Sequence, residues 1–363
     1  MNWGSAQDKL IADLDPLCAD PLMLQVPQLN NAGELKGLVA LLQVLCGRAA
    51  IESRSYNEIL AIVRDIGIVA GSIQRHGYSP VVLAPELESI LLRAAQLTDL
   101  PARDTLMHYT VWNPNGPRLR TYTSHEQEPH LIESIRISLP AIRDATRGLF
   151  RIRDMGLQDN NAISIAYKIA DQLDVFLSGL KHAKHHVTPD AFISCFRPYF
   201  EPFVVGDSLL RGPGVVTMPL HIFDFLLWGS SETNQQYQLF TSDYIPYNTS
   251  EFRHYYLQTR NTPSFLDMLE AEAHLGENLS ALQPLLAAVE VWFRKVRGFR
   301  GAHLKYSNKA YHGTTDHNFK TGSGGHTNSD MEVIASLTSK HSNRLDSLLK
   351  KELNYVAVDD ADS

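Results

Sequence analysis

The feature that most constrains the fold of this sequence is an apolar stripe that ends in a histidine. Between Leu282 and His303, apolar side chains recur at steps of three or four residues, at Leu282, Leu286, Val289, Phe293, Val296 and Phe299. This spacing is typical of one face of an α-helix, so it predicts a long helix that buries that face. His303 is the next position on the face, and we expect its imidazole to lie against the core as well.

Helix signals dominate the rest of the chain. Capping boxes at residues 55–58 and 329–332 predict two helix starts, because a serine oxygen accepts a free amide while a glutamate reaches back. The first of these helices should stop at His76-Gly77, and Thr188 followed by Pro189 indicates a further start. Apolar spacing predicts other helices at about 85–96, 128–152, 161–182, 215–228 and 263–275, and no period-two pattern indicates a strand. The sequence therefore predicts an all-α fold.

Length and composition suggest two parts. The 363 residues exceed the usual size of one compact domain, and 44% hydrophobic with 20% charged residues is ordinary for a globular protein. A polar, proline-bearing segment at residues 112–117 interrupts the helices. We expect a smaller N-terminal helical portion at residues 1–117 and a larger helical domain at residues 118–363.

Charge and cysteine content argue against several classes of partner. A formal charge of −7 disfavours nucleic acid, which needs a clustered basic face. Three cysteines without a Cys-x-x-Cys spacing indicate neither a disulfide framework nor a thiolate metal site. The N-terminal residues lack a secretory pattern, and the most apolar stretch, from Leu38 to Cys46, is too short to span a membrane. We expect a cytoplasmic protein without a membrane partner.

The residues around His303 resemble a known enzyme superfamily. The run Phe299-Arg300-Gly301-Ala302-His303-Leu304-Lys305, followed by Tyr311 and a glycine-rich segment at residues 322–325, is similar to the proximal-histidine helix and glycine loop of the tryptophan and indoleamine dioxygenase heme superfamily. Within it, the chain more closely resembles the monodechloroaminopyrrolnitrin synthase family, which catalyses the second step of pyrrolnitrin biosynthesis. Similar blocks occur in order over nearly the whole chain, at His108 and at residues 64–67, 71–73, 75–77, 110–114, 218–220 and 227–230.

The resemblance implies an all-α, multi-helix heme-binding bundle in which His303 is the proximal ligand of heme b. A lone histidine on an apolar stripe is usually a core residue, so without the resemblance this role would be a minor alternative. The implied substrate is an indole amino acid, tryptophan or 7-chlorotryptophan. The implied reaction rearranges the indole oxidatively to a phenylpyrrole and removes the carboxyl group, with dioxygen or peroxide as co-substrate and an unidentified electron donor.

The resemblance also implies residues that contact the substrate. Tyr311 and Ser323 match positions that hydrogen-bond the substrate, although a tyrosine near a helix end can also simply cover the core. Ser134 aligns loosely with a distal serine of the indoleamine enzymes, but most helical serines are inert.

A second segment supplies the candidate carboxylate site. Arg197 belongs to a stretch similar to the one that provides the carboxylate-binding arginine of the dioxygenases, and a planar guanidinium suits a bidentate carboxylate. The alternative, to which we give equal weight, is that Arg197 forms an ion pair with Glu201 or donates to helix carbonyls. In the first case Phe192 and Ile193 are expected to form the pocket wall.

Two other functions remain compatible with these residues. One is a tryptophan dioxygenase that opens the indole ring by inserting dioxygen, and the other is a heme- or indole-binding protein without turnover. No motif specifies a chlorine pocket, an electron donor or an oligomeric state.

Overall fold

The structure is a computed structural model that describes residues 5–214, 218–275, 279–312 and 327–359. These residues are predominantly helical, with a single two-stranded sheet of three-residue strands, so the predicted all-α class is confirmed. Contacts between Cα atoms group the chain into two units. Unit 1 comprises Met1–Pro140, Gly179–Val216 and Tyr306–Thr327, and unit 2 comprises Ala141–Ser178, Thr217–Lys305 and Asn328–Ser363.

Each of most elements lies entirely within a single unit, whereas three long helices contribute residues to both units. Unit 1 contains α1 (Ala6–Asp13), α2 (Asp20–Met23), α3 (Val26–Ala32), α4 (Leu35–Arg48), η1 (Ile51–Ser53), α5 (Tyr56–Arg75), α6 (Pro80–Leu83), α7 (Glu86–Thr98), α8 (Leu106–Tyr109), η2 (Gly116–Arg118), α11 (Pro189–Ala191), η3 (Phe192–Phe196), η4 (Arg197–Phe200), β1 (Phe203–Val205) and β2 (Ser208–Leu210). Unit 2 contains α12 (Met218–Leu227), η5 (Gly229–Ser231), α13 (Gln235–Tyr244), η6 (Ile245–Tyr247), α14 (Ser250–Thr259), α15 (Phe265–Leu275) and α17 (Asn328–Asp359). The shared helices are α9 (Glu128–Met155), α10 (Ala162–His186) and α16 (Leu279–His312).

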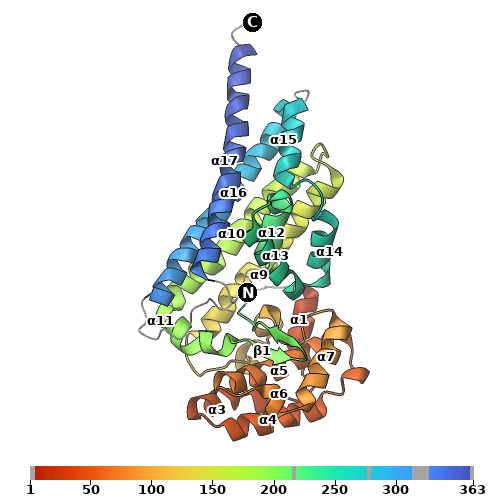
Figure 1. Cartoon of the computed structure of the whole chain (residues 1–363), viewed down its shortest axis with the longest axis vertical. Helices are drawn as coiled ribbons and strands as arrows, with labels where there is room; N and C mark the ends of the chain where they lie inside the picture. The colour runs from red at the N-terminus through yellow and green to blue at the C-terminus, as the bar shows by residue number, and fades with distance from the viewer. Residues whose placement is uncertain (1–4, 215–217, 276–278, 313–326, 360–363) are drawn as a thin grey trace. The chain divides into compact units, whose positions relative to one another are not determined.

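Helix α5 is the centre of unit 1. The predicted capping box is confirmed, because Ser55 accepts from the Glu58 amide and Glu58 accepts from the Ser55 amide, and the helix ends at Arg75 with His76 as its cap, at the predicted stop. Every residue from 59 to 73 is buried, as expected for a helix that neighbours enclose on all sides. Helices α1, α4, α7 and α8 pack against it, and Figure 1 shows α3 to α7 gathered around it.

A buried charge cluster lies on α5. Asp65 is fully buried, and Arg64 binds both of its carboxylate oxygens at 2.8 and 3.0 Å. Arg120 donates to the same carboxylate at 3.1 Å and reaches Asp20 at 2.6 Å. Desolvation works to raise the pKa of Asp65, but the two guanidinium groups outweigh it and hold this pKa below its ordinary value. The cluster is therefore ionised at neutral pH and joins three separate segments of unit 1.

Gly67, within one of the blocks noted in the sequence, allows a close approach in the core. A Cβ atom added at Gly67 would overlap the side chain of Asp104. Asp104 is itself 1% exposed and is held by Arg103 through bonds of 3.2 and 3.3 Å. The glycine at this position is explained by packing between α5 and the segment before α8.

The sequence pattern did not predict the two short strands of unit 1. Residues 203–205 and 208–210 form an antiparallel hairpin in which Phe203 and Val205 are buried. Each strand has only three residues, which is too short to show a period of two. Arg103 anchors the hairpin by donating to the carbonyls of Glu201 and Leu210 at 3.2 and 3.0 Å.

Unit 2 contains the predicted long helix. The stripe residues from Leu282 to Val296 are buried in α16, and this prediction is confirmed. Beside the stripe, Trp292 donates its indole N–H to the Ala166 carbonyl of α10 at 3.0 Å. The indole bond and the apolar face together fix α16 against α10.

The C-terminal helix begins earlier than its predicted cap. Helix α17 starts at Asn328, so Ser329 already lies in the first turn and the prediction of Ser329 as the cap is wrong. The buried face of α17 is formed by Ile334, Thr338, His341, Leu345 and Leu348.

The predicted boundary segment, residues 112–117, belongs to unit 1. Arg136 of α9 donates to the carbonyls of Thr110, Asn113 and Pro114 at 2.6 to 3.1 Å. The division into portions 1–117 and 118–363 stays a prediction.

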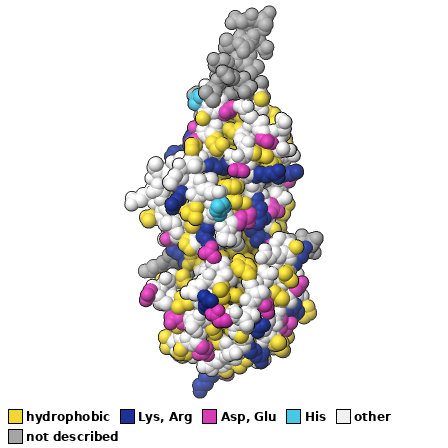
Figure 2. Space-filling model, turned by 90° about the vertical axis from the view of Figure 1, so that its right-hand side faces the viewer, with side chains coloured by type: hydrophobic (Ala, Val, Ile, Leu, Met, Phe, Trp, Pro, Cys, Tyr) yellow, Lys and Arg dark blue, Asp and Glu magenta, His cyan; other side chains and the backbone are white. Residues whose placement is uncertain are grey.

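No helix in the described part of the chain is long and apolar enough to cross a membrane. Figure 2 shows acidic and basic side chains intermixed on the face that it displays.

We expect Gly67→Ala to lower the free energy of unfolding by about 1–3 kcal/mol, because the new methyl group overpacks the core against Asp104. Gly47→Ala is the matched control. Gly47 is helical and exposed, and its added Cβ has no neighbour within 4 Å, so this change should stabilise the protein by up to about 1 kcal/mol. Urea unfolding of both variants measures the difference, and equal stabilities would contradict the packing argument.

Candidate functional site

His303 is partly buried on α16, and its environment favours a neutral ring. Its Nδ1 atom is buried and has no hydrogen-bond partner among the described residues. Burial, together with the nearby Arg300 charge, lowers the pKa of His303 to about 4. The imidazole is therefore neutral at neutral pH and keeps a lone pair that can bind a metal ion.

Aromatic rings fix the orientation of this imidazole. Phe299, one turn earlier on α16, stacks on His303 with an interplanar angle of 8° and ring centroids 5.5 Å apart. Phe176 of α10 packs against Phe299 at 4.5 Å. The stacked pair continues the apolar face of α16, so the histidine is held by the same packing that holds the helix.

A buried ion pair lies one turn from His303. Arg300 of α16 donates to the carboxylate of Asp224 on α12, and the two side chains are 6% and 1% exposed. Burial lowers the pKa of Arg300 to about 9, so the guanidinium is still protonated at neutral pH. The pair ties the histidine-bearing turn of α16 to α12.

The Arg300–Asp224 ion pair was not predicted from the sequence, although the sequence around Asp224 contains an indication of it. Asp224 is the only carboxylate in α12, where nearly all the other residues are apolar, and such a residue needs a charged partner when it is buried. Its partner lies 76 residues away, and no local spacing connects the two positions.

The Arg197 segment has an unusual backbone. Residues 192–196 form a π-helical turn, and Arg197 begins a short 3₁₀ turn. Arg197 is 3% exposed and pairs with Glu201 at 2.5 Å, which is the alternative that the sequence left open. Ile193 is buried and Phe192 is half-buried against the core of unit 1. Substrate contacts by these three residues stay a prediction.

The remaining candidates differ in their surroundings. Ser134 is buried in α9 and donates its hydroxyl to the Leu131 carbonyl at 2.6 Å, a bond within its own helix. Tyr311 is half-buried in the last turn of α16. Earlier in the same helix, Tyr306 donates its hydroxyl to the Val187 carbonyl at 2.7 Å. Ser323 and the glycine-rich segment around it lie outside the described residues.

The candidate residues divide between the two units. His303 belongs to unit 2, together with Phe299, Arg300 and Asp224. Unit 1 contains Ser134, Phe192, Ile193, Arg197 and Tyr311.

We expect Asp224→Ala to destabilise the protein by about 3–5 kcal/mol, because it leaves the buried Arg300 charge without its carboxylate. Asp174→Ala removes another acidic partner of α16, a residue 64% exposed and 2.7 Å from Lys295. This control should cost less than about 1 kcal/mol. Thermal and urea unfolding separate the two, and similar losses would show that the Arg300 pair contributes no more than a surface pair.

Comparison with known protein families shows to which family the chain belongs. The model of the family described as monodechloroaminopyrrolnitrin synthase PrnB matches residues 28–356. This match covers well over half of the chain and includes His303, Arg197, Tyr311 and Ser323, so the resemblance noted in the sequence is confirmed. The chain therefore belongs to the monodechloroaminopyrrolnitrin synthase family, whose members are heme-dependent oxidoreductases of the tryptophan dioxygenase superfamily and act in pyrrolnitrin biosynthesis.

Proposed function

We propose that this protein binds heme b through His303 and converts tryptophan or 7-chlorotryptophan into a phenylpyrrole with loss of the carboxyl group. Family membership supplies the heme dependence and the biosynthetic role. The ligand, the substrate and the product are our proposal. The observation that supports it most directly is the neutral imidazole of His303, whose Nδ1 is buried without a partner at the end of the apolar stripe.

The residues around His303 fit a heme ligand. Iron takes a neutral imidazole as a donor, and the low pKa of His303 means that little energy is spent on deprotonating the ring at neutral pH. Stacking on Phe299 restricts rotation of the ring. The Arg300–Asp224 pair holds the backbone turn that presents it. These contacts orient the ring from outside, a task that a hydrogen bond from the second ring nitrogen performs in most ligating histidines.

The protein side chains and the cofactor have separate tasks. Heme iron supplies the redox chemistry that protein side chains lack, with dioxygen and an external reductant, or with peroxide, as the oxidant. The chain binds and orients the indole amino acid. We assign carboxylate binding to Arg197, which would exchange its Glu201 partner for the substrate.

Other contacts complete the proposed substrate site. Phe192 and Ile193 lie on the π-helical turn that leads into Arg197 and would form an apolar wall. Tyr311 and Ser323 would hydrogen-bond the substrate, and Ser134 is a candidate for the distal side. Family membership supports these roles, since the family match includes all five positions.

We expect His303→Ala to lose or strongly alter the Soret band of the hemin-reconstituted protein, because the proximal donor is gone. Added imidazole should restore a wild-type-like spectrum by filling the vacated position. Ultraviolet-visible titration with hemin measures both effects. His254→Ala, a change at an exposed histidine of α14, is the matched control and should keep the wild-type spectrum.

If His303→Ala and His254→Ala gave the same Soret spectrum as wild type, His303 would not be the ligand. Far-ultraviolet circular dichroism of each variant distinguishes loss of the ligand from loss of the fold.

Product mass tests the reaction. Supplied with tryptophan or 7-chlorotryptophan and either dioxygen with reductant or peroxide, the reconstituted protein should release a product that has lost carbon dioxide. A product that gains two oxygen atoms and keeps its carboxyl group would identify a ring-opening dioxygenase. Indole binding without any product under both oxidant conditions would identify a carrier.

A further inference from the structure

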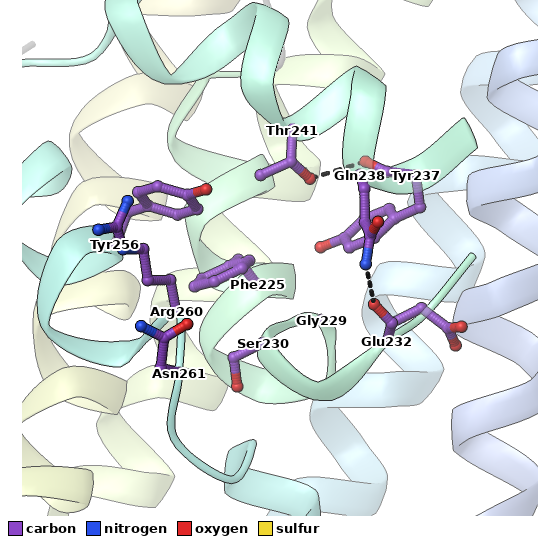
Figure 3. A pocket seen from close by; sticks show the side chains of 10 residues that line it. All are labelled: Phe225, Gly229, Ser230, Glu232, Tyr237, Gln238, Thr241, Tyr256, Arg260 and Asn261. Atoms are coloured by element: carbon purple, nitrogen blue, oxygen red, sulfur yellow. Dashed lines mark hydrogen bonds between the residues drawn. The ribbon is translucent and has the colours of Figure 1, made fainter. Parts of the chain in front are cut away.

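Unit 2 contains a pocket that the proposed reaction does not use. Its volume is about 430 Å³, within the range of small-molecule sites, and its lining comes from α12, the turn η5 and Glu232 after it, α13, α14 and the two residues that follow α14. Figure 3 shows Tyr256 and Arg260 on one side and Tyr237 on the other, with Phe225 between them. None of the lining residues contacts His303, Phe299 or Arg300 through any of the interactions described above.

One of the family-like sequence blocks builds this pocket. Residues 227–230 end α12 and form the turn η5, where Gly229 and Ser230 line the pocket. Trp228 packs on Tyr237 with ring centroids 4.8 Å apart. A Cβ atom at Gly229 would overlap the Tyr237 hydroxyl, so the glycine is what leaves room for that hydroxyl beside the turn.

The Tyr237 hydroxyl forms no hydrogen bond of normal geometry in the described part of the chain, and its polar neighbour there is Thr241. The residue is 1% exposed, and Figure 3 shows its hydroxyl directed toward the middle of the lining side chains. Burial raises the pKa of Tyr237 well above its ordinary value, so the group stays protonated and can donate. A buried donor without an acceptor is unfavourable, and a ligand oxygen would satisfy it.

The uncompensated charge of the pocket is positive. Arg260 is exposed, and no described residue forms an ion pair or side-chain hydrogen bond with its guanidinium. Glu232 also lines the pocket, but its carboxylate is bound by Lys340 at 2.9 Å and by His341 at 2.8 Å. An anionic group on a ligand is therefore favoured at the Arg260 side.

Aromatic rings form the wall between these two polar groups. Phe225 and Tyr256 pack with centroids 4.7 Å apart and an interplanar angle of 49°. Such a wall favours a flat, apolar ring system through stacking and edge contacts.

We propose that this pocket binds a small aromatic carboxylate. The carboxylate pairs with Arg260, the ring packs against Phe225 and Tyr256, and a hydrogen-bond acceptor at the far end of the ligand receives the Tyr237 hydroxyl proton in a hydrogen bond. The assignment does not depend on the heme reaction, because it uses a different set of residues.

Three related compounds and three variants test the site by calorimetry on the heme-loaded protein. The probe is 5-methoxyindole-3-acetate, its amide lacks the negative charge, and indole-3-acetate lacks the methoxy acceptor. Arg260→Gln removes the cation, Tyr237→Phe removes the donor, and Arg294→Gln is a control that removes an exposed arginine from another hollow of unit 2.

Wild type and Arg294→Gln should bind the acid about tenfold or more tightly than the amide, as expected for a charge-assisted hydrogen bond. Arg260→Gln should abolish that preference and keep the methoxy preference. Tyr237→Phe should keep the preference for the acid over the amide and abolish the preference for the methoxy compound. Binding that is equal in Arg260→Gln and Arg294→Gln, or absent in wild type at millimolar probe, would overturn the proposal.

The Soret band separates this pocket from the heme site. Occupation of the pocket should leave the Soret band of wild type unchanged, and Arg260→Gln should keep the wild-type response of that band to tryptophan. Heat released by the probe together with a Soret shift that Arg260→Gln does not alter would place the probe at the heme and contradict our assignment. The calorimetric result does not depend on which residue of the chain ligates the heme, so a failure of the His303 assignment leaves it unchanged.

Discussion

The buried carboxylate of Asp65 is the interaction on which unit 1 depends. Arg64 and Arg120 neutralise it inside the core, and the remaining N–H groups of Arg64 donate to the carbonyls of Ile11, Leu14 and Trp112. Removing either partner would leave a charge in a medium that solvates it poorly. The cluster therefore makes the central helix α5 and the segments that wrap it a single structural element.

In unit 2, helix α16 is likewise held in place by buried contacts. Its apolar face is buried by ordinary packing, and the last positions of that face present Phe299 and His303 instead of another aliphatic side chain. The imidazole is desolvated because the helix is buried, and desolvation keeps it neutral. The candidate ligand is thus a consequence of helix packing, with the Arg300–Asp224 pair fixing the turn that bears it.

Several of the sequence blocks that resemble the family stabilise the fold. Residues 64–67 supply the buried charges and the glycine beside Asp104, and the asparagine and proline of 110–114 present carbonyls to Arg136. Residues 227–230 shape the pocket with Arg260 and Tyr237. Similarity in sequence therefore marks residues that hold the fold as well as residues that face a ligand.

The sequence by itself determined most of the long helices, because caps and apolar spacing act between residues three or four apart. It predicted α5 from its capping box and α16 from its stripe, and it identified His303 as an unusual member of that stripe. Only the tertiary structure revealed the short hairpin, the Asp224 partner of Arg300 and the Tyr237 hydroxyl without a hydrogen bond, and it decided between the two alternatives for Arg197 by showing the pair with Glu201. Most of these features join residues that are distant in the chain, and burial changes their energies, so no local periodicity encodes them.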